Sequence, residues 1–299
     1  MNILVVSGFL GSGKTTFIST LAKKTKNEFL VMENEYGSEG IDGDILRDDR
    51  LKVWELTEGC ICCSLKGDFA SSILTIANTV DVEYLVVEPT GLGLLSSIMK
   101  NISRIEYDRI KLLSPVTVVD VHAVSSSLNK FATIYTDQIK NATIIVLSKV
   151  EDALPREKDE AIAIIRYLNP KACLIEECYE ELSTEWWAHL FTNFYRKEYQ
   201  KIDYKEDVDF ENLENISLKD VSVESVTELL EIIVAILRGF FGAIYRAKGC
   251  LDIEGYWTRF DVVDKRYSVV LSENRTEAKV VLIGQKLDKK KIYKAFGLT

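Results

Sequence analysis

Short apolar runs recur through the first part of the chain, and each stops at a glycine, a carboxylate or a hydroxyl residue. The segments between the runs carry apolar residues at helical spacing. Strands that alternate with helices predict right-handed crossovers and a mostly parallel sheet, the α/β class. The polar stops then lie at the carboxyl ends of strands, where open α/β sheets bind their ligands. The predicted strands are residues 3–6, 29–32, 53–56, 84–87, 115–119, 144–147 and 173–175.

The pattern changes beyond residue 182, where the chain becomes aromatic and charged without a clear period. We interpret residues 182–215 as a helix plus a linker, and expect its aromatics to pack at a domain junction; a partner surface is the alternative. From residue 215 we predict a small α+β domain with an apolar helix over 226–241, strands near 216–218, 249–253, 257–263, 267–271 and 279–283, and a closing helix from Asp288. The expected domains are 1–185, a linker 186–214, and 215–299.

Composition narrows the class of protein. The 299 residues carry a net charge of −9, which argues against a nucleic-acid partner because phosphate-backbone binders need a basic face. No apolar segment has the length of a membrane span, and the first apolar run leads directly into a glycine-rich loop, unlike a signal peptide. We therefore expect a cytoplasmic protein whose six cysteines are thiols or metal ligands.

The stretch after the first strand fits the phosphate-loop pattern G-x-x-x-x-G-K-[ST], with a strand before it and a helix after it. Its glycines allow backbone N–H groups to surround phosphate oxygens at a helix N-terminus. Lys14 is expected to reach the β and γ phosphates, and the Thr15 hydroxyl to contact Mg²⁺. A Gly-rich turn with a purely structural role is the alternative. The expected nucleotide contacts are Gly8, Gly11, Ser12, Gly13, Lys14, Thr15 and Thr16.

Two further strand ends carry carboxylates. Glu88 is followed by Gly91, so a carboxylate for the magnesium shell and a glycine N–H for the γ-phosphate come within one turn. We assign catalytic roles to Lys14, Glu88 and Gly91. Asp120 ends the next strand and is either a site residue or a helix cap. A cap is also the alternative role for Glu88.

Base recognition is assigned to the segment Ser148-Lys149-Val150-Glu151. Guanine presents two adjacent N–H donors, and a carboxylate two residues after a lysine can accept from both. The commoner form of this motif is N-K-x-D, so Ser148 and Glu151 are departures from it. GTP is the predicted nucleotide, and adenine or relaxed specificity stays open.

Three thiols lie within four residues at Cys60, Cys62 and Cys63. They concentrate soft ligands for Zn²⁺, Co²⁺ or a similar ion, with room for a carboxylate or a recipient's ligand. A buried apolar role and a redox dithiol are the alternatives.

The motifs GFLGSGKTT, NEYG, CICC, EPTGLG and SKVE, in this order, resemble those of the CobW-like family of P-loop GTPases, related to the UreG, HypB and MeaB metallocenter-assembly proteins. YRAKG and VVLIGQKLD resemble the family's C-terminal domain. The resemblance implies a metal chaperone in which GTP and metal bind cooperatively, the cysteines hold the metal, and hydrolysis accompanies release to a client metalloprotein or corrinoid-dependent enzyme. It adds Glu35 and Asp42 as candidates for metal or magnesium contact.

Two other functions stay open. One is a nucleotide-gated switch that regulates a client enzyme without carrying metal, and the other is a small-molecule kinase, disfavoured because the chain has no arginine-rich lid. A homodimer is compatible with each of these functions.

Overall fold

The computed structural model describes residues 1–33, 52–55, 66–195, 214–263, 266–272 and 277–298. These described residues divide into two compact units, one holding those up to 195 and the other those from 214 onward. Within the described ranges, no helix has both the length and the apolarity needed to span a bilayer.

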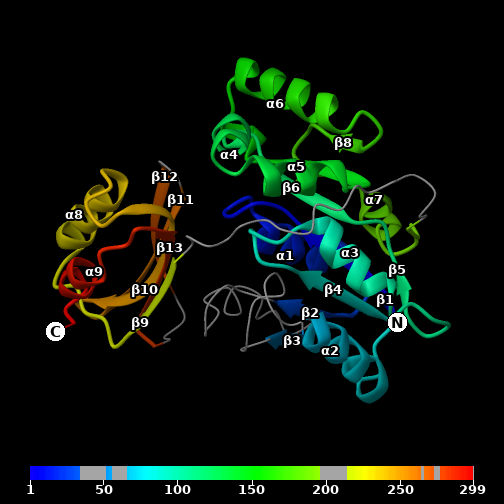
Figure 1. Cartoon of the computed structure of the whole chain (residues 1–299), viewed down its shortest axis with the longest axis horizontal. Helices are drawn as coiled ribbons and strands as arrows, with labels where there is room; N and C mark the ends of the chain where they lie inside the picture. The colour runs from blue at the N-terminus through cyan, green and yellow to red at the C-terminus, as the bar shows by residue number, and fades with distance from the viewer. Residues whose placement is uncertain (34–51, 56–65, 196–213, 264–265, 273–276, 299) are drawn as a thin grey trace. The chain divides into compact units, whose positions relative to one another are not determined.

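The first unit is an α/β domain whose described strands form a parallel sheet in the order β3-β2-β4-β1-β6-β7-β8, with β5 also pairing with β1 (Figure 1). This confirms the predicted parallel α/β core. The strands are β1 (Asn2–Ser7), β2 (Phe29–Glu33), β3 (Lys52–Glu55), β4 (Tyr84–Glu88), β5 (Lys111–Leu112), β6 (Val116–Asp120), β7 (Ile144–Ser148) and β8 (Cys173–Ile175).

Helices lie on both faces of this sheet. The side chains of β1 point alternately to the two faces, and those on each face pack against helices. Ile3 and Val5 join one buried cluster with α2, α3, α5 and α6, whereas Leu4 and Val6 join another with α1 and α7. Both faces of the strand are therefore apolar, as a doubly covered parallel sheet requires. The helices are α1 (Lys14–Lys24), α2 (Lys66–Thr79), α3 (Leu95–Ser103), α4 (Val124–Lys130), α5 (Ala132–Lys140), α6 (Pro155–Leu168) and α7 (Thr184–His189), with 3₁₀ turns η1 (Val150–Asp152) and η2 (Tyr179–Glu181).

The aromatic segment after residue 182 contains the expected helix, α7. Trp187 and Phe191 are buried in the first unit, where the Trp187 ring lies 4.9 Å from that of Phe17 in α1. The first compact unit accordingly continues past residue 185, and α7 belongs to its core.

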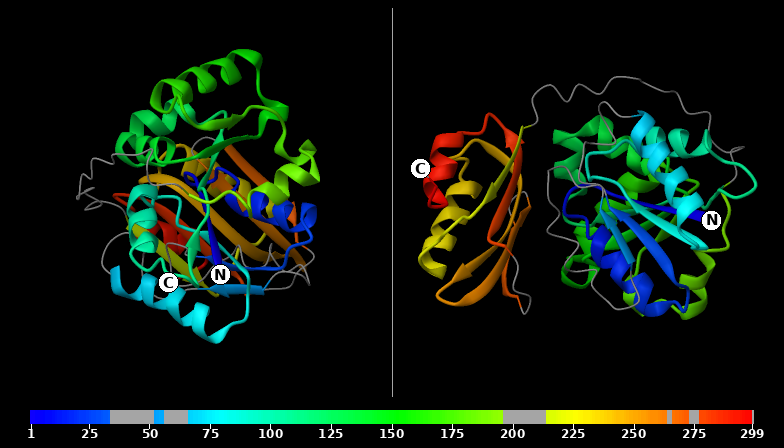
Figure 2. Two further views of the ribbon diagram at one scale, coloured as in Figure 1. Left: turned by 90° about the vertical axis from the view of Figure 1, so that its right-hand side faces the viewer. Right: turned by 90° about the horizontal axis from the view of Figure 1, so that it is seen from below.

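The second unit is a five-stranded antiparallel sheet, over the described residues, in the order β12-β11-β10-β13-β9. Figure 2 shows α8 and α9 on one face of it, where they close a separate apolar core that includes Leu229, Ile233, Phe260 and Phe296. The elements are β9 (Glu214–Lys219), α8 (Val226–Leu237), β10 (Ala243–Ile253), β11 (Tyr256–Val263), β12 (Arg266–Leu271), β13 (Lys279–Gln285) and α9 (Lys289–Ala295).

Two predicted boundaries in this unit were wrong. Helix α8 ends at Leu237 instead of Phe241, because Gly239 adopts a left-handed φ of +73° and stops it. Phe240 is consequently 59% exposed and does not continue the helical stripe. Strand β10 begins at Ala243, six residues before the expected start at Gly249.

Candidate functional site

The loop between β1 and α1 has the backbone of a phosphate cradle. Gly8, Gly11 and Gly13 have φ values of +148°, +68° and +92°, which side-chain-bearing residues rarely adopt. A Cβ at Gly8 would lie 2.3 Å from the Val118 carbonyl oxygen. Helix α1 starts at Lys14, with no side-chain cap and no acidic residue in its first turn. Its N-terminal N–H groups and dipole therefore favour an anion.

The residues that follow the loop point in different directions. Lys14 is buried, and its ammonium donates to the Phe9 carbonyl oxygen at 3.3 Å, inside the loop. The Thr15 hydroxyl donates to Glu88 Oε1 at 3.0 Å, which joins the start of α1 to the end of β4. Thr16 is exposed on the first turn of α1.

A second carboxylate, Glu33, lies next to Glu88. It ends β2 and is paired with Glu88 in the parallel register of β2 and β4, and both side chains are buried. Glu33 was not among the predicted site residues, which included Glu35 and Asp42 from the following segment. The available signal was that Glu33, like Glu88, directly follows an apolar strand.

The turn after Glu88 lies against the phosphate loop. A Cβ on Gly91 would be 2.6 Å from the Leu10 backbone nitrogen, so only glycine fits there. Gln138 on α5 is buried and donates from Nε2 to the Gly91 and Gly93 carbonyl oxygens at 3.0 and 2.9 Å. Gln138 thus fixes this turn from behind, a role that the sequence analysis did not identify.

Strand β7 delivers two side chains to the same loop. The Ser148 hydroxyl donates to the Ser12 carbonyl oxygen at 2.7 Å, and Lys149 Nζ donates to the Gly11 carbonyl oxygen at 2.9 Å. Lys149 also pairs with Asp120 Oδ2 at 2.6 Å, while Asp120 Oδ1 accepts from the His122 backbone N–H. Asp120 therefore closes the turn after β6 and does not cap α4, whose N-terminus has no side-chain cap. Its part in the site stays a prediction.

Glu151 lies beyond Lys149 in the turn η1 and is exposed. A hydrogen bond from the Cys178 thiol is the main cause that lowers the pKa of the Glu151 carboxyl. Burial, followed by the same contact with Glu151, raises the pKa of the Cys178 thiol. The carboxylate assigned to the base thus has a thiol neighbour from the segment after β8.

Two family models match this chain, one within each of its two compact units. The family model described as CobW/HypB/UreG, nucleotide-binding domain, matches residues 2–176, more than half of the chain. The chain belongs to the CobW/HypB/UreG family. The model of the cobalamin synthesis protein cobW C-terminal domain matches residues 224–297. This confirms the resemblance to CobW-like P-loop GTPases drawn from the motifs.

Individual relatives differ in how much of the chain they match. The zinc chaperone YeiR of Escherichia coli K12 is 33% identical over 161 residues, which cover 53% of this chain and 49% of YeiR. The zinc chaperone YjiA of the same organism is 26% identical over 316 residues, covering 99% of this chain and 97% of YjiA. The crystal structure of the Zn(II)-bound YjiA GTPase aligns with 100% of this chain and 99% of that one, at 21% identity and a TM-score of 0.46.

The predicted transition-metal ligands and the two carboxylates added by the resemblance lie outside the described residues. These are Cys60, Cys62, Cys63, Glu35 and Asp42. Within the described ranges, no three His, Cys, Asp or Glu side chains are grouped so that they can hold a metal ion. The described cysteines, Cys173, Cys178 and Cys250, are free thiols.

Proposed function

We propose that this protein binds and hydrolyses GTP and uses the nucleotide cycle to deliver a transition metal, Zn²⁺ or Co²⁺, to a client metalloprotein or a corrinoid-dependent enzyme. The observation that carries the proposal is the hydrogen bond of 3.0 Å between Thr15 and Glu88. It brings the two oxygen ligands expected for Mg²⁺ together beside a glycine cradle, on the strand that leads to Gly91.

The chain's own residues divide the nucleotide between them. Lys14 and the loop N–H groups hold the phosphates, and the Gly91 N–H meets the γ-phosphate. Thr15 and Glu88 would hold Mg²⁺, which neutralises charge on the transferred phosphoryl group. Because the turn at Gly91 touches Leu10 of the loop, loss of the γ-phosphate is transmitted to both segments together.

Guanine selection is assigned to Glu151, whose carboxylate accepts from the N1 and N2 donors of the base. Ser148 and Lys149 support the base site indirectly, because they donate hydrogen bonds to carbonyl oxygens of the phosphate loop. Their role is therefore to fix the loop, and Glu151 carries the choice between guanine and adenine.

The metal half of the proposal rests on the relatives named zinc chaperones and on the three thiols. Cys60, Cys62 and Cys63 are soft ligands suited to Zn²⁺, with Glu35 and Asp42 as nearby oxygen donors in the sequence. In this scheme metal is the cargo. Binding of GTP tightens the thiolate site, and hydrolysis weakens it so that the client takes the ion.

The test uses the full chain, purified without oxygen and analysed for bound metals. Zn²⁺, Co²⁺ and Ni²⁺ are then titrated alone and with a non-hydrolysable analogue of GTP or of ATP. We expect the GTP analogue to tighten metal binding by some factor, and metal to tighten the analogue by the same factor. Metal affinities that do not change with the GTP analogue would refute the coupling.

A switch that carries no metal is the competing function, and the variant with Cys60, Cys62 and Cys63 all changed to serine separates the two. Metal delivery predicts that this variant still binds and hydrolyses GTP but no longer activates a client metalloprotein. A switch without cargo predicts that client activation survives. Size-exclusion chromatography with and without GTP determines whether the working form is a homodimer.

A further inference from the structure

The first unit contains a cavity of about 680 Å³ at the edge of the sheet opposite the phosphate loop. Three lining residues lie at the starts of strands: Ser114 is two residues before β6, and Thr143 and Ala172 directly precede β7 and β8. Parallel strands share one direction, so their amino ends gather at one edge and their carboxyl ends at the other. The cavity therefore shares no residue with the site built around Lys14 and Glu88.

The wall of the cavity between α5 and β8 is tied together by a buried amide. Asn169 Nδ2 donates to the carbonyl oxygens of Ile139 and Ala142 at 2.8 and 3.0 Å, and its Oδ1 accepts from the Ala172 N–H at 3.1 Å. The amide also donates to the Lys140 carbonyl oxygen at 3.2 Å. These bonds hold the wall in place, so the cavity is formed before any ligand enters.

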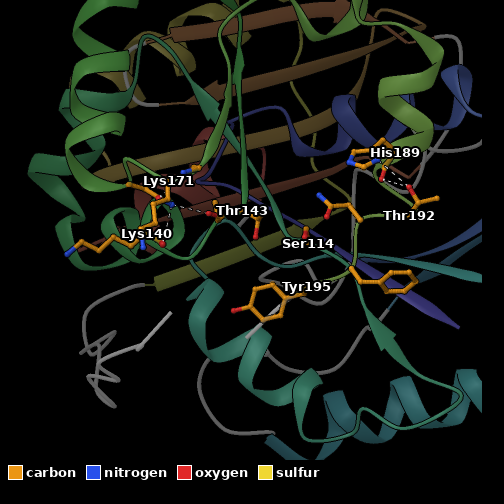
Figure 3. A pocket seen from close by; sticks show the side chains of 12 residues that line it. Ser114, Lys140, Thr143, Lys171, His189, Thr192 and Tyr195 are labelled. Carbon is orange, nitrogen blue, oxygen red and sulfur yellow. Dashed lines mark hydrogen bonds between the residues drawn. The ribbon is translucent and has the colours of Figure 1, made fainter. Parts of the chain in front are cut away.

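The opposite wall is fixed by backbone hydrogen bonds. The Ser114 N–H donates to the Asn193 carbonyl oxygen at 2.8 Å, and the Tyr195 N–H donates to the Leu112 carbonyl oxygen at 3.0 Å. Figure 3 shows Lys140 and Lys171 at one end of the cavity and His189 at the other, with Thr143 and Ser114 between them.

The charge of the lining is opposite to that of the chain. The whole sequence has 46 acidic and 37 basic residues, yet the lining includes Lys140, Lys171 and His189 and no carboxylate. Within the part of the chain that the structure describes, the Lys171 ammonium and the hydroxyls of Ser114 and Thr143 make no hydrogen bond or ion pair. The cavity thus holds a cation and hydroxyl donors that the fold itself does not use.

We propose that this cavity binds a small organic anion through a carboxylate or phosphate group. Lys171 is the main charge partner, the hydroxyls of Thr143 and Ser114 donate to the anion's oxygens, and Ala142, Ala172 and Phe194 contact its carbon body. The cavity volume lies within the range of small-molecule sites, and the cavity is too small to admit the surface of a partner protein. Both points favour a metabolite-sized ligand. This site shares no residue with the proposed GTP and metal sites, and its test does not depend on them.

The experiment is calorimetric titration of the metal-free full chain, at constant ionic strength, with citrate and with inorganic phosphate as probes. We expect saturable binding of at least one probe with a Kd of about 1 mM or tighter. Citrate binding alone indicates a carboxylate ligand, and phosphate binding alone indicates a phosphate ligand. Phosphate bound at the glycine loop is recognised separately, because Lys14→Ala removes it and leaves binding in the cavity.

Lys171→Glu is the decisive variant, because it reverses a charge on an exposed side chain without touching the core. We expect it to weaken probe binding about tenfold or more, and Thr143→Val to weaken it about threefold. Lys294→Glu on α9 is the matched control, since it makes the same change of charge on an exposed lysine of the second unit. It should change the affinity less than about twofold.

Three outcomes would overturn the proposal. One is the absence of saturable binding for both probes up to about 20 mM. Another is an equal loss of affinity in Lys171→Glu and Lys294→Glu, which would mean that only net charge matters. The last is binding of a glutamate-rich peptide, lost in Lys171→Glu, without any binding of citrate or phosphate, which would make the surface a peptide site.

Discussion

The two edges of the parallel sheet use polar side chains in opposite ways. At the carboxyl edge, Thr15, Ser148 and Lys149 are committed to partners within the protein at 2.6 to 3.0 Å. At the amino edge, Lys171 and the hydroxyls of Ser114 and Thr143 make no such bonds within the described residues. At the carboxyl edge the side chains fix the phosphate loop, whereas at the amino edge the side-chain donors are available to a ligand.

This difference separates two ways of building a site. A phosphate cradle binds mainly through backbone N–H groups, so side chains are best used to fix the loop before the anion arrives. A cavity that binds through side chains needs those side chains unpaired, and its walls are fixed by other groups such as Asn169. Substitutions at the two edges should consequently affect different ligands.

The largest effect is expected from Lys14→Ala. The buried ammonium is the charge closest to the predicted β and γ phosphates, so its loss should weaken nucleotide binding about 100-fold, equivalent to about 2.7 kcal/mol. Titration with a fluorescent GTP analogue measures this. Citrate binding at the amino edge is the internal control and should stay the same. A Lys14→Ala protein that binds the analogue normally would remove the loop from the proposed site.

The next effect concerns the pair formed by Lys149 and Asp120. The Asp120 side chain is only 8% exposed, so Lys149→Met leaves a buried carboxylate without its ammonium partner. We expect a loss of about 2 kcal/mol in the free energy of unfolding, measured with urea. Because the lysine side chain is 38% exposed, solvent screening keeps the loss below that of a fully buried pair.

Asp120→Asn combined with Lys149→Met provides the control for this pair. Removing the charge of Asp120 should recover about 1 kcal/mol of the stability lost in Lys149→Met. Additive losses in the double variant would mean that the two side chains do not interact energetically.

A smaller effect on binding is expected from Gly91→Ala. The new Cβ would meet backbone atoms of Leu10 at 2.6 and 2.8 Å, which cannot move aside as a side chain does. The turn and the loop must separate, so we expect GTP hydrolysis and analogue affinity to fall about tenfold, and stability by about 1 to 2 kcal/mol.

Gly255→Ala is the control for the loss of a glycine. Gly255 has a φ of +85°, but nothing lies within 4 Å of a Cβ placed there. It should lower stability by about 1 kcal/mol and leave nucleotide binding unchanged. Equal effects of the two substitutions on nucleotide binding would show that the contact between Gly91 and Leu10 is unimportant.

The carboxyl edge was largely predictable because its positions follow from local patterns. Ser7, Glu88, Asp120 and Ser148 each come directly after an apolar run, and a parallel sheet brings such positions to one edge. The short strand β5 was not predicted, because two residues are too few to show the alternation of apolar and polar side chains that marks a strand. The end of α8 was misplaced because Phe240 continues the helical spacing although Gly239 has already ended the helix.

Contacts between distant segments could not be predicted in this way. Gln138 lies between Asp137 and Ile139 on α5, and nothing nearby in the sequence indicates that its amide meets a turn 47 residues earlier. The amino-edge cavity is equally hidden, because its walls come from strand starts and from the segment after α7. These features depend on three-dimensional packing, whereas the motifs depend on short-range spacing.

The smallest effect is expected from Cys178→Ala, which removes the contact between Cys178 after β8 and Glu151 after β7. The thiol hydrogen bond holds the pKa of Glu151 below its usual value, so the carboxylate stays ionised to a lower pH than an isolated glutamate. Without the thiol the pKa of Glu151 rises, and as pH falls Glu151 becomes protonated sooner. The acidic limb of GTP-analogue binding should therefore move to higher pH, while affinity at neutral pH changes less than about threefold.

Cys173→Ala, which removes an exposed thiol from the same segment, is the control for Cys178→Ala and should leave the pH profile unchanged. Reaction of Cys178 with iodoacetamide gives a second readout: Glu151→Gln removes one of the influences that raise the thiol's pKa, so alkylation at neutral pH should become faster. Superimposable pH profiles for the wild type and Cys178→Ala would mean that the thiol does not tune Glu151, whatever the nucleotide preference proves to be.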